Sequence, residues 1–136
     1  MIKTVAAAAL AAALLAPAAA MAHHSFSMFD VTKSVTINGV VSGFEWSNPH
    51  CWLRVMTTDA KGGQTTWSFE MTSPNLLARS GWRPATIKPG EKITVVGVPL
   101  RDGNPGAQFR SATLPDGRQL TTASVPKAGA PVGSAQ

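Results

Sequence analysis

VTINGVVSGFEW, residues 35–46, is the stretch from which the architecture of this chain can be worked out. β-Branched and aromatic side chains recur at alternate positions, which is the period of a strand with one buried face. Ile37 falls on one face, and after Gly39 the phase shifts to Phe44 and Trp46. A glycine at a change of phase is typical of a β-bulge, and a bulged first strand helps a sheet to close into a small barrel.

The alternation continues in the next strand, residues 51–56. Its core face is expected to carry Cys51, Leu53 and Val55. Its other face would carry His50, Trp52, Arg54 and Met56. Further strands are predicted, after the turn at 59–63, at 65–71 with Trp67 and Phe69 inward, at 92–100, and at 107–114 with a short return at Gln119 and Leu120.

One short helix is predicted between the third and fourth strands. Ser73 is a good N-cap and Pro74 suits the first helical position. Leu76 and Leu77 are expected to face inward. Gly81 stands where a left-handed C-terminal cap would lie, and Trp82 after it can fold back onto the helix.

Three strands, one helix and two strands make the element order of an OB-fold, a small five-stranded, partly open barrel. The alternative is a small β-sandwich, or an open meander with one helix across it. We assign residues 23–120 to this domain. Residues 121–136 are an Ala/Gly/Pro/Ser tail with almost no bulky side chain, and such a tail is expected to be disordered because it buries too little apolar surface.

Residues 1–22 have the pattern of a secretory signal peptide. Lys3 precedes an uncharged apolar run, and Ala20 and Ala22 have the spacing that signal peptidase recognises. The run is shorter than the roughly 20 residues that span a bilayer, so we expect an exported protein without an integral membrane segment. Cleavage after Ala22 leaves His23 at the N-terminus; the alternative, cleavage after Ala20, leaves Met21-Ala22-His23.

Composition restricts the classes of function. The chain has 136 residues and a formal charge of +5, but its Lys and Arg residues are scattered singly, which argues against a nucleic-acid partner. Cys51 is the single cysteine, so no internal disulfide forms. The chain lacks the G-x-S-x-G, CxxC, H-E-x-x-H and phosphate-loop patterns, which favours a binding protein over an enzyme.

Four motifs carry a family resemblance. They read AHHSFSMFD (22–30), VSGFEWSNPHCWLRV (41–55), SPNLLARSGW (73–82) and IKPGEKITVVGVPLRDG (87–103). Together they resemble an uncharacterised family of bacterial exported proteins, catalogued as domain of unknown function 6152. The resemblance implies a periplasmic location and brings no established activity, so no catalytic residue is transferred from it.

The histidines give the sharpest candidate site, a copper site. His23 would offer its free α-amine and its ring to one metal ion, and His24 follows it. An imidazole from His50 would complete a three-nitrogen histidine brace, and imidazole suits copper, nickel and zinc. Asp30 or Glu45 would orient an imidazole. Weaker candidate ligands, soft ones that favour Cu(I), are Met28, Met56 and Cys51.

Each of these residues also has a plain structural explanation. His23 and His24 would then be a frayed terminus, His50 a turn residue bonded to backbone, and Cys51 a buried core thiol.

Three functions follow. The leading hypothesis is a periplasmic copper-binding module for storage, delivery or sensing, whose partners are a metal ion and another periplasmic protein. The second is a module that binds a glycan, small ligand or protein on the surface around Trp52 and Arg54. The third is a histidine-brace copper oxidase or mono-oxygenase, which so small a domain disfavours.

Overall fold

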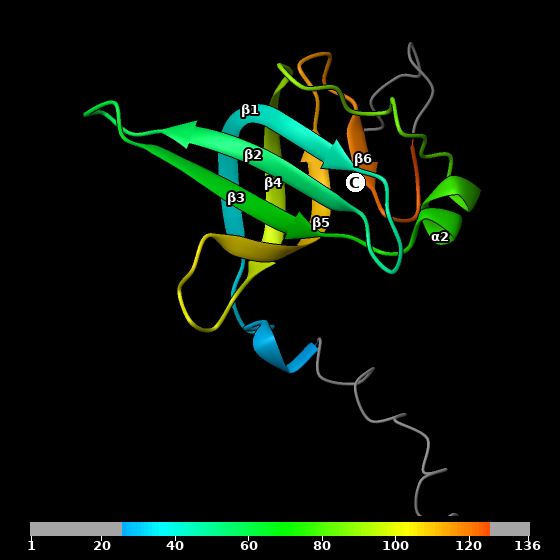
Figure 1. Cartoon of the computed structure of the whole chain (residues 1–136), viewed down its shortest axis with the longest axis horizontal. Helices are drawn as coiled ribbons and strands as arrows, with labels where there is room; N and C mark the ends of the chain where they lie inside the picture. The colour runs from blue at the N-terminus through cyan, green and yellow to red at the C-terminus, as the bar shows by residue number, and fades with distance from the viewer. Residues whose placement is uncertain (1–25, 126–136) are drawn as a thin grey trace, which may run out of the picture.

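The structure, a computed structural model, describes residues 26–125 (Figure 1). The predicted signal peptide, His23, His24 and residues 126–136 of the predicted tail lie outside the described residues. The elements, in chain order, are η2 (Phe26–Met28), β1 (Val35–Glu45), β2 (Trp52–Thr58), β3 (Gln64–Glu70), α2 (Pro74–Arg79), β4 (Lys92–Pro99), β5 (Gly106–Thr113) and β6 (Gln119–Thr121). Every predicted strand and the helix are present, with ends that differ by at most two residues.

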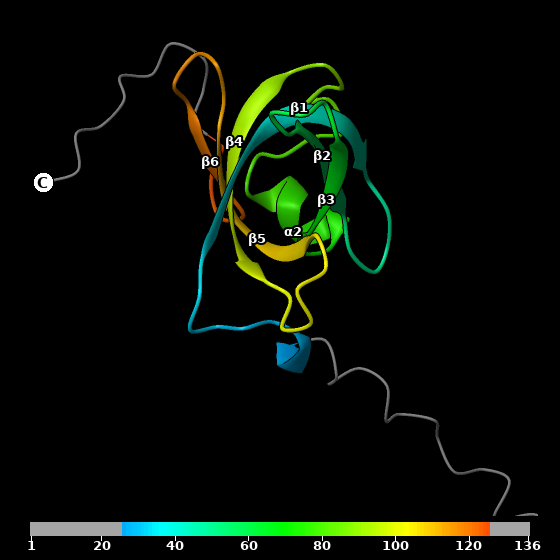
Figure 2. The same ribbon diagram turned by 90° about the vertical axis from the view of Figure 1, so that its left-hand side faces the viewer.

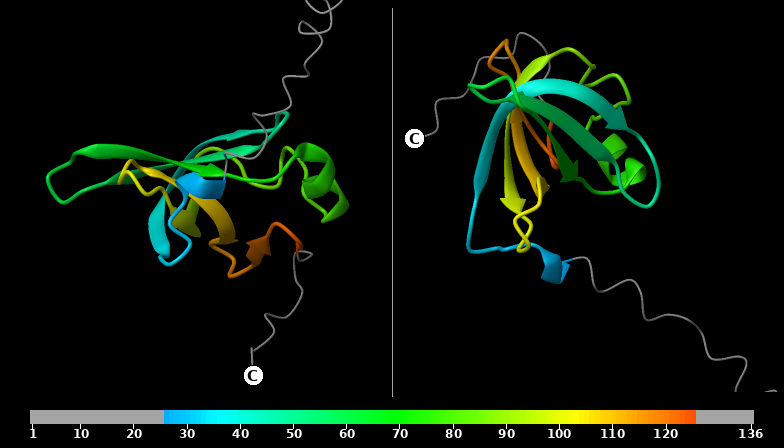
Figure 3. Two further views of the ribbon diagram at one scale, coloured as in Figure 1. Left: turned by 90° about the horizontal axis from the view of Figure 1, so that it is seen from below. Right: turned by 60° about the vertical axis from the view of Figure 1, so that its left-hand side comes forward.

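The strands close into the predicted OB-type barrel. β1 lies between β2 and β4, and β4 pairs with β5, all antiparallel. β3 and β5 then pair in parallel, with Phe69 opposite Ala107, and this seam closes a five-stranded mixed barrel. Figure 2 shows the ring of strands, and Figure 3 shows the β2–β3 hairpin projecting beyond it. The seam rules out the sandwich and the open meander, because neither joins the third strand to the fifth.

β1 serves two partners, and this explains the phase shift seen in the sequence. Its first half pairs with β4 and its second half with β2, with Val40 paired on both sides. The predicted bulge at Gly39 is wrong: the register against β2 shifts between Val41 and Gly43. Gly39 has another role, since a Cβ there would stand 2.5 Å from the carbonyl oxygen of Met56. It lets the backbone of β2 cross close to β1.

Trp82 is the largest buried side chain of the core. It has no exposed surface, and its ring contacts Phe44 and Phe109 at centroid distances of 5.9 and 5.8 Å. Its Nε1 donates a hydrogen bond to the carbonyl oxygen of Thr121 at 2.8 Å, so the indole is satisfied as well as packed. The predicted inward face of β2 is confirmed, since Leu53 and Val55 are fully buried with it.

The helix ends as predicted but buries less than predicted. Ser73 is the N-cap, and Gly81 has φ 92°. Leu77 is fully buried, whereas Leu76 is 51% exposed, so the expectation that both face inward is wrong. Successive helical residues point about 100° apart, and so short a helix buries only one of the two.

The folded domain continues past the predicted boundary at residue 120. Thr121 belongs to β6 and pairs with Ser111 of β5, and Val125 packs against the core. The hydrogen bond from Trp82 to Thr121 and the apolar contact of Val125 hold these residues against the barrel, although their composition had assigned them to the tail. No helix within residues 26–125 is long and apolar enough to cross a membrane.

Candidate functional site

His50 lies at the end of the loop that joins β1 to β2. The Asn48–Pro49 peptide bond in this loop is cis. Next to His50, the N–H of Cys51 donates to the carbonyl of Thr72 at 3.1 Å, and the carbonyl of Cys51 accepts from the N–H of Met71 at 2.9 Å. Two backbone hydrogen bonds to the chain after β3 therefore fix the position of His50.

The His50 imidazole is oriented by a buried carboxylate. Its Nδ1 contacts Oε1 of Glu70, the last residue of β3. Glu70 is only 9% exposed, while the His50 side chain is 38% exposed. With Nδ1 engaged by a carboxylate, Nε2 is the ring nitrogen free for a ligand, which is how proteins commonly orient a metal-binding histidine.

A small pocket lies beside this pair. Glu70 lines it together with Trp52, which is directly opposite Glu70 across β2 and β3. The pocket has a volume of about 140 Å³, and Met28 and Leu100 lie on its other walls. The structure thus brings Met28 and Trp52 together and connects them to His50 through Glu70.

The segment that carries Met28 is held against the β4–β5 loop. Arg101 donates from its backbone N–H to the Met28 carbonyl at 2.9 Å and from Nε to the Ser27 carbonyl at 3.0 Å. Phe29, 3% exposed, forms a β-bridge with Leu100. These contacts fix where the chain enters the domain, next to the small pocket.

The carboxylates that were expected to orient an imidazole have other partners. Asp30 accepts a hydrogen bond from the Thr32 hydroxyl at 2.6 Å and pairs with Lys33 at 3.0 Å. These interactions, the Thr32 bond above all, lower the pKa of Asp30 to about 2. Glu45 pairs with Arg54. Among the described residues, neither Asp30 nor Glu45 orients the His50 imidazole, and Glu70 contacts it instead.

Trp52 and Arg54, which were predicted to form a ligand surface, lie on one face of β2, and Arg54 is held in place. Arg54 donates from Nε to Glu45 at 2.8 Å and from Nη1 to the Ser68 hydroxyl at 3.1 Å. Trp52 is two residues away on the same face of β2 and is partly exposed. The surface therefore offers an indole beside an ordered, paired guanidinium.

Two of the weaker metal candidates, Met56 and Cys51, do not share a surface with the His50 ring. Met56 is toward the other end of β2, roughly 13 Å along the strand from Trp52. Cys51 has no exposed surface, and its burial raises the pKa of its thiol. Cys51 is a core residue and Met56 belongs to a different surface. Within residues 26–125, no three His, Cys, Asp or Glu side chains come together as a metal site.

Glu70 is the residue of the candidate site that the sequence analysis did not single out. Nothing in its local sequence marks it. The register of the β2–β3 hairpin is the signal that finds it, because pairing outward from the turn at 59–63 places Glu70 opposite Trp52 and next to His50.

Comparison with known proteins gives one match. No curated protein and no solved structure matches the chain. The model of a family of unknown function, DUF6152, matches residues 10–127, so the resemblance drawn from the four motifs is confirmed and the chain belongs to this family.

Proposed function

We propose that this protein is an exported, periplasmic copper-binding module that stores, delivers or senses the metal. The observation that carries the proposal is the contact between His50 and Glu70. A half-exposed imidazole whose Nδ1 faces a buried carboxylate presents Nε2 outward and is made a better electron donor by its partner.

The second ligand within the described chain is Met28. Its side chain is 47% exposed, and it shares a pocket with Glu70. Imidazole and thioether together suit Cu(I), and Trp52 in the same pocket supplies an aromatic face that attracts a cation. Two ligands are too few for tight binding, so we infer that the N-terminus supplies the others.

The position of Met28 makes that possible. His23 precedes Met28 by five residues, a span of roughly 17 Å when extended. Arg101 holds the Ser27 and Met28 carbonyls, so the chain starts this span beside the pocket. After cleavage following Ala22, the amine and ring of His23 would add two nitrogens to His50 and Met28.

The test uses a chain that begins at His23. Cu(II) binding is followed by EPR, and Cu(I) affinity by competition with a chromophoric chelator. We expect one copper per chain, with weaker binding in both His23→Ala and His50→Ala. A chain beginning at Met21 is the matched comparison, because a histidine at the third position gives a different, four-nitrogen square-planar spectrum. Copper binding that is weak and insensitive to both substitutions would refute the proposal.

A second function has one observation in its favour. The pocket of about 140 Å³ beside Trp52 lies between β3 and the β4–β5 loop, a region where OB-folds bind oligosaccharides. Binding of a soluble glycan that is lost in Trp52→Ala and kept in His50→Ala would assign this function instead. Reductant-dependent oxygen consumption by the copper-loaded chain would indicate the oxidase alternative.

A further inference from the structure

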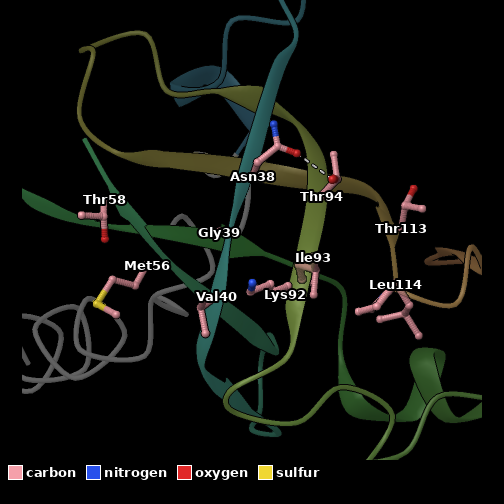
Figure 4. Close-up of a pocket in the computed structure, with 11 residues that line it drawn as sticks. Asn38, Gly39, Val40, Met56, Thr58, Lys92, Ile93, Thr94, Thr113 and Leu114 are labelled. Atoms are coloured by element: carbon pink, nitrogen blue, oxygen red, sulfur yellow. Dashed lines mark hydrogen bonds between the residues drawn. The ribbon is translucent and has the colours of Figure 1, made fainter. Parts of the chain in front are cut away.

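A larger hollow lies on the outer surface, away from His50. Its volume is about 510 Å³, within the usual range of small-molecule sites. Figure 4 shows the segments that form it, β1 at Asn38–Val40, β2 at Met56, β4 at Lys92–Thr94 and the chain after β5 at Leu114. No role in the proposed copper site involves it.

The hollow is a consequence of how β1 changes partner. Val40 pairs with Met56 on one side and with Lys92 on the other, so the pairing of β1 with β4 ends and its pairing with β2 begins at this residue. Gly39, whose missing side chain lets β2 cross closely, is also part of the lining. The concavity is therefore set by backbone pairing and does not depend on the rotamer of a single side chain.

The walls are mainly aliphatic. Val40, Met56 and Leu114 supply apolar surface, and the described lining residues include no aromatic ring. Sugars and bases are usually bound by stacking on aromatic rings, so this lining disfavours them. A methionine thioether adapts its shape to flexible apolar groups, which favours an alkyl chain.

One charge marks the hollow. Lys92 is the charged residue among the described lining residues, and it makes no ion pair within residues 26–125. Beside it, the Thr94 hydroxyl donates to Oδ1 of Asn38 at 2.6 Å, which leaves the amide nitrogen of Asn38 as a donor for a ligand. The ammonium of Lys92 suits a carboxylate.

We propose that this hollow binds a free medium-chain alkyl carboxylate, with its headgroup at Lys92 and its chain along Val40 and Met56. This activity is independent of copper.

Octanoate and 1-octanol are titrated into the ¹⁵N-labelled chain that begins at His23, without metal. We expect saturable amide shifts at Val40, Ile93 and Thr94 with octanoate and weaker binding of 1-octanol. An exposed ion pair contributes modestly, so Lys92→Ala should weaken octanoate binding roughly threefold to fivefold. Lys92→Arg should keep it, and Lys88→Ala, a lysine outside the lining, is the matched control.

Thr113→Trp, a substitution at an exposed rim residue, should block the hollow and abolish the shifts for both probes. Equal binding of octanoate to the parent chain and Lys92→Ala, or shifts that centre on Trp52, would overturn the proposal. So would co-sedimentation with phosphatidylglycerol vesicles without any octanoate shift, because the hollow would then contact a membrane and not a free acid.

Discussion

Nδ1 of His50, in the loop after β1, contacts the carboxylate of Glu70, the last residue of β3. Two segments far apart in sequence thus share one side-chain contact, and it joins the candidate ligand to the barrel. A histidine with such a partner has one fixed ring orientation.

Glu70→Gln tests that orientation. The substitution keeps the shape of the side chain and removes its charge, so copper affinity should fall roughly tenfold or more. Competition titration against a chelator measures the loss. Glu45→Gln is the matched control, because Glu45 pairs with Arg54 and not with a histidine. Equal affinity in both variants would show that the Glu70 charge does not act on the metal.

Met28→Leu tests the thioether ligand. Cu(I) affinity should fall roughly tenfold, equivalent to about 1.4 kcal/mol, while Cu(II) affinity changes little because Cu(II) prefers nitrogen. Met56→Leu, at the larger hollow and away from the small pocket, should leave both affinities unchanged. A loss of the same size in both variants would indicate a general effect on the fold.

The thiol of Cys51 should be inert in the folded protein. It has no exposed surface and its pKa is raised by burial, so the reactive thiolate is both scarce and inaccessible. Ellman's reagent should react with it only after unfolding in guanidinium chloride, and Cys51→Ala should bind copper as the parent chain does. Rapid reaction under native conditions would contradict the core assignment.

Asp30 should contribute to stability in a pH-dependent way. Its pKa is about 2 in the folded protein, below the ordinary value of about 3.9, so the folded state binds fewer protons in that range. Its contribution is present above pH 4 and is lost as the pH falls toward 2. The melting temperature of Asp30→Asn should therefore lie below that of the parent chain at pH 6, and the difference should shrink as the pH approaches 2. Thr32→Val, which removes the main hydrogen bond, should show the same trend.

Gly39→Ala tests the crossing of β1 and β2. The new Cβ would stand 2.5 Å from a backbone oxygen, so we expect a loss of about 1–3 kcal/mol in the free energy of unfolding. Gly43→Ala is the matched control on the same strand, because no atom lies within 4 Å of its added Cβ. Urea denaturation measures the free energy of unfolding of both variants. An equal loss in Gly39→Ala and Gly43→Ala would contradict the close approach of β2 to Gly39.

The sequence was sufficient for the strands, the helix and the barrel, because alternation and turn residues are local signals. The β1 alternation and the cap residues Ser73 and Gly81 lie where the pattern predicts. Two local predictions were wrong. The burial of Leu76 depends on which face of a single helical turn packs inward, and the position of the bulge depends on which strands pair with β1.

The site was only partly accessible from sequence. His50 and Trp52 could be singled out by residue type. The fold adds that both lie next to Glu70, which contacts the His50 ring and lines the small pocket with Trp52. Glu70 is found only through the register of the β2–β3 hairpin, and the hydrogen bond from Arg101 to the Ser27 carbonyl joins segments far apart in the sequence, so residue type alone marks neither.

The parallel pairing of β3 with β5 has a consequence for how the protein matures. It joins Glu70 to Gln108 across α2 and the whole of β4, which makes it a contact of high sequence separation that forms at a large entropic cost. The contact between His50 and Glu70 depends on the pairing of β2 with β3, whereas the small pocket also needs Leu100 and Ala107 from the other side of the seam, so the pocket is complete only after the sheet has closed. If the chain binds copper as proposed, His50 would be oriented as soon as the hairpin forms, and Met28 would join it only once the barrel has closed.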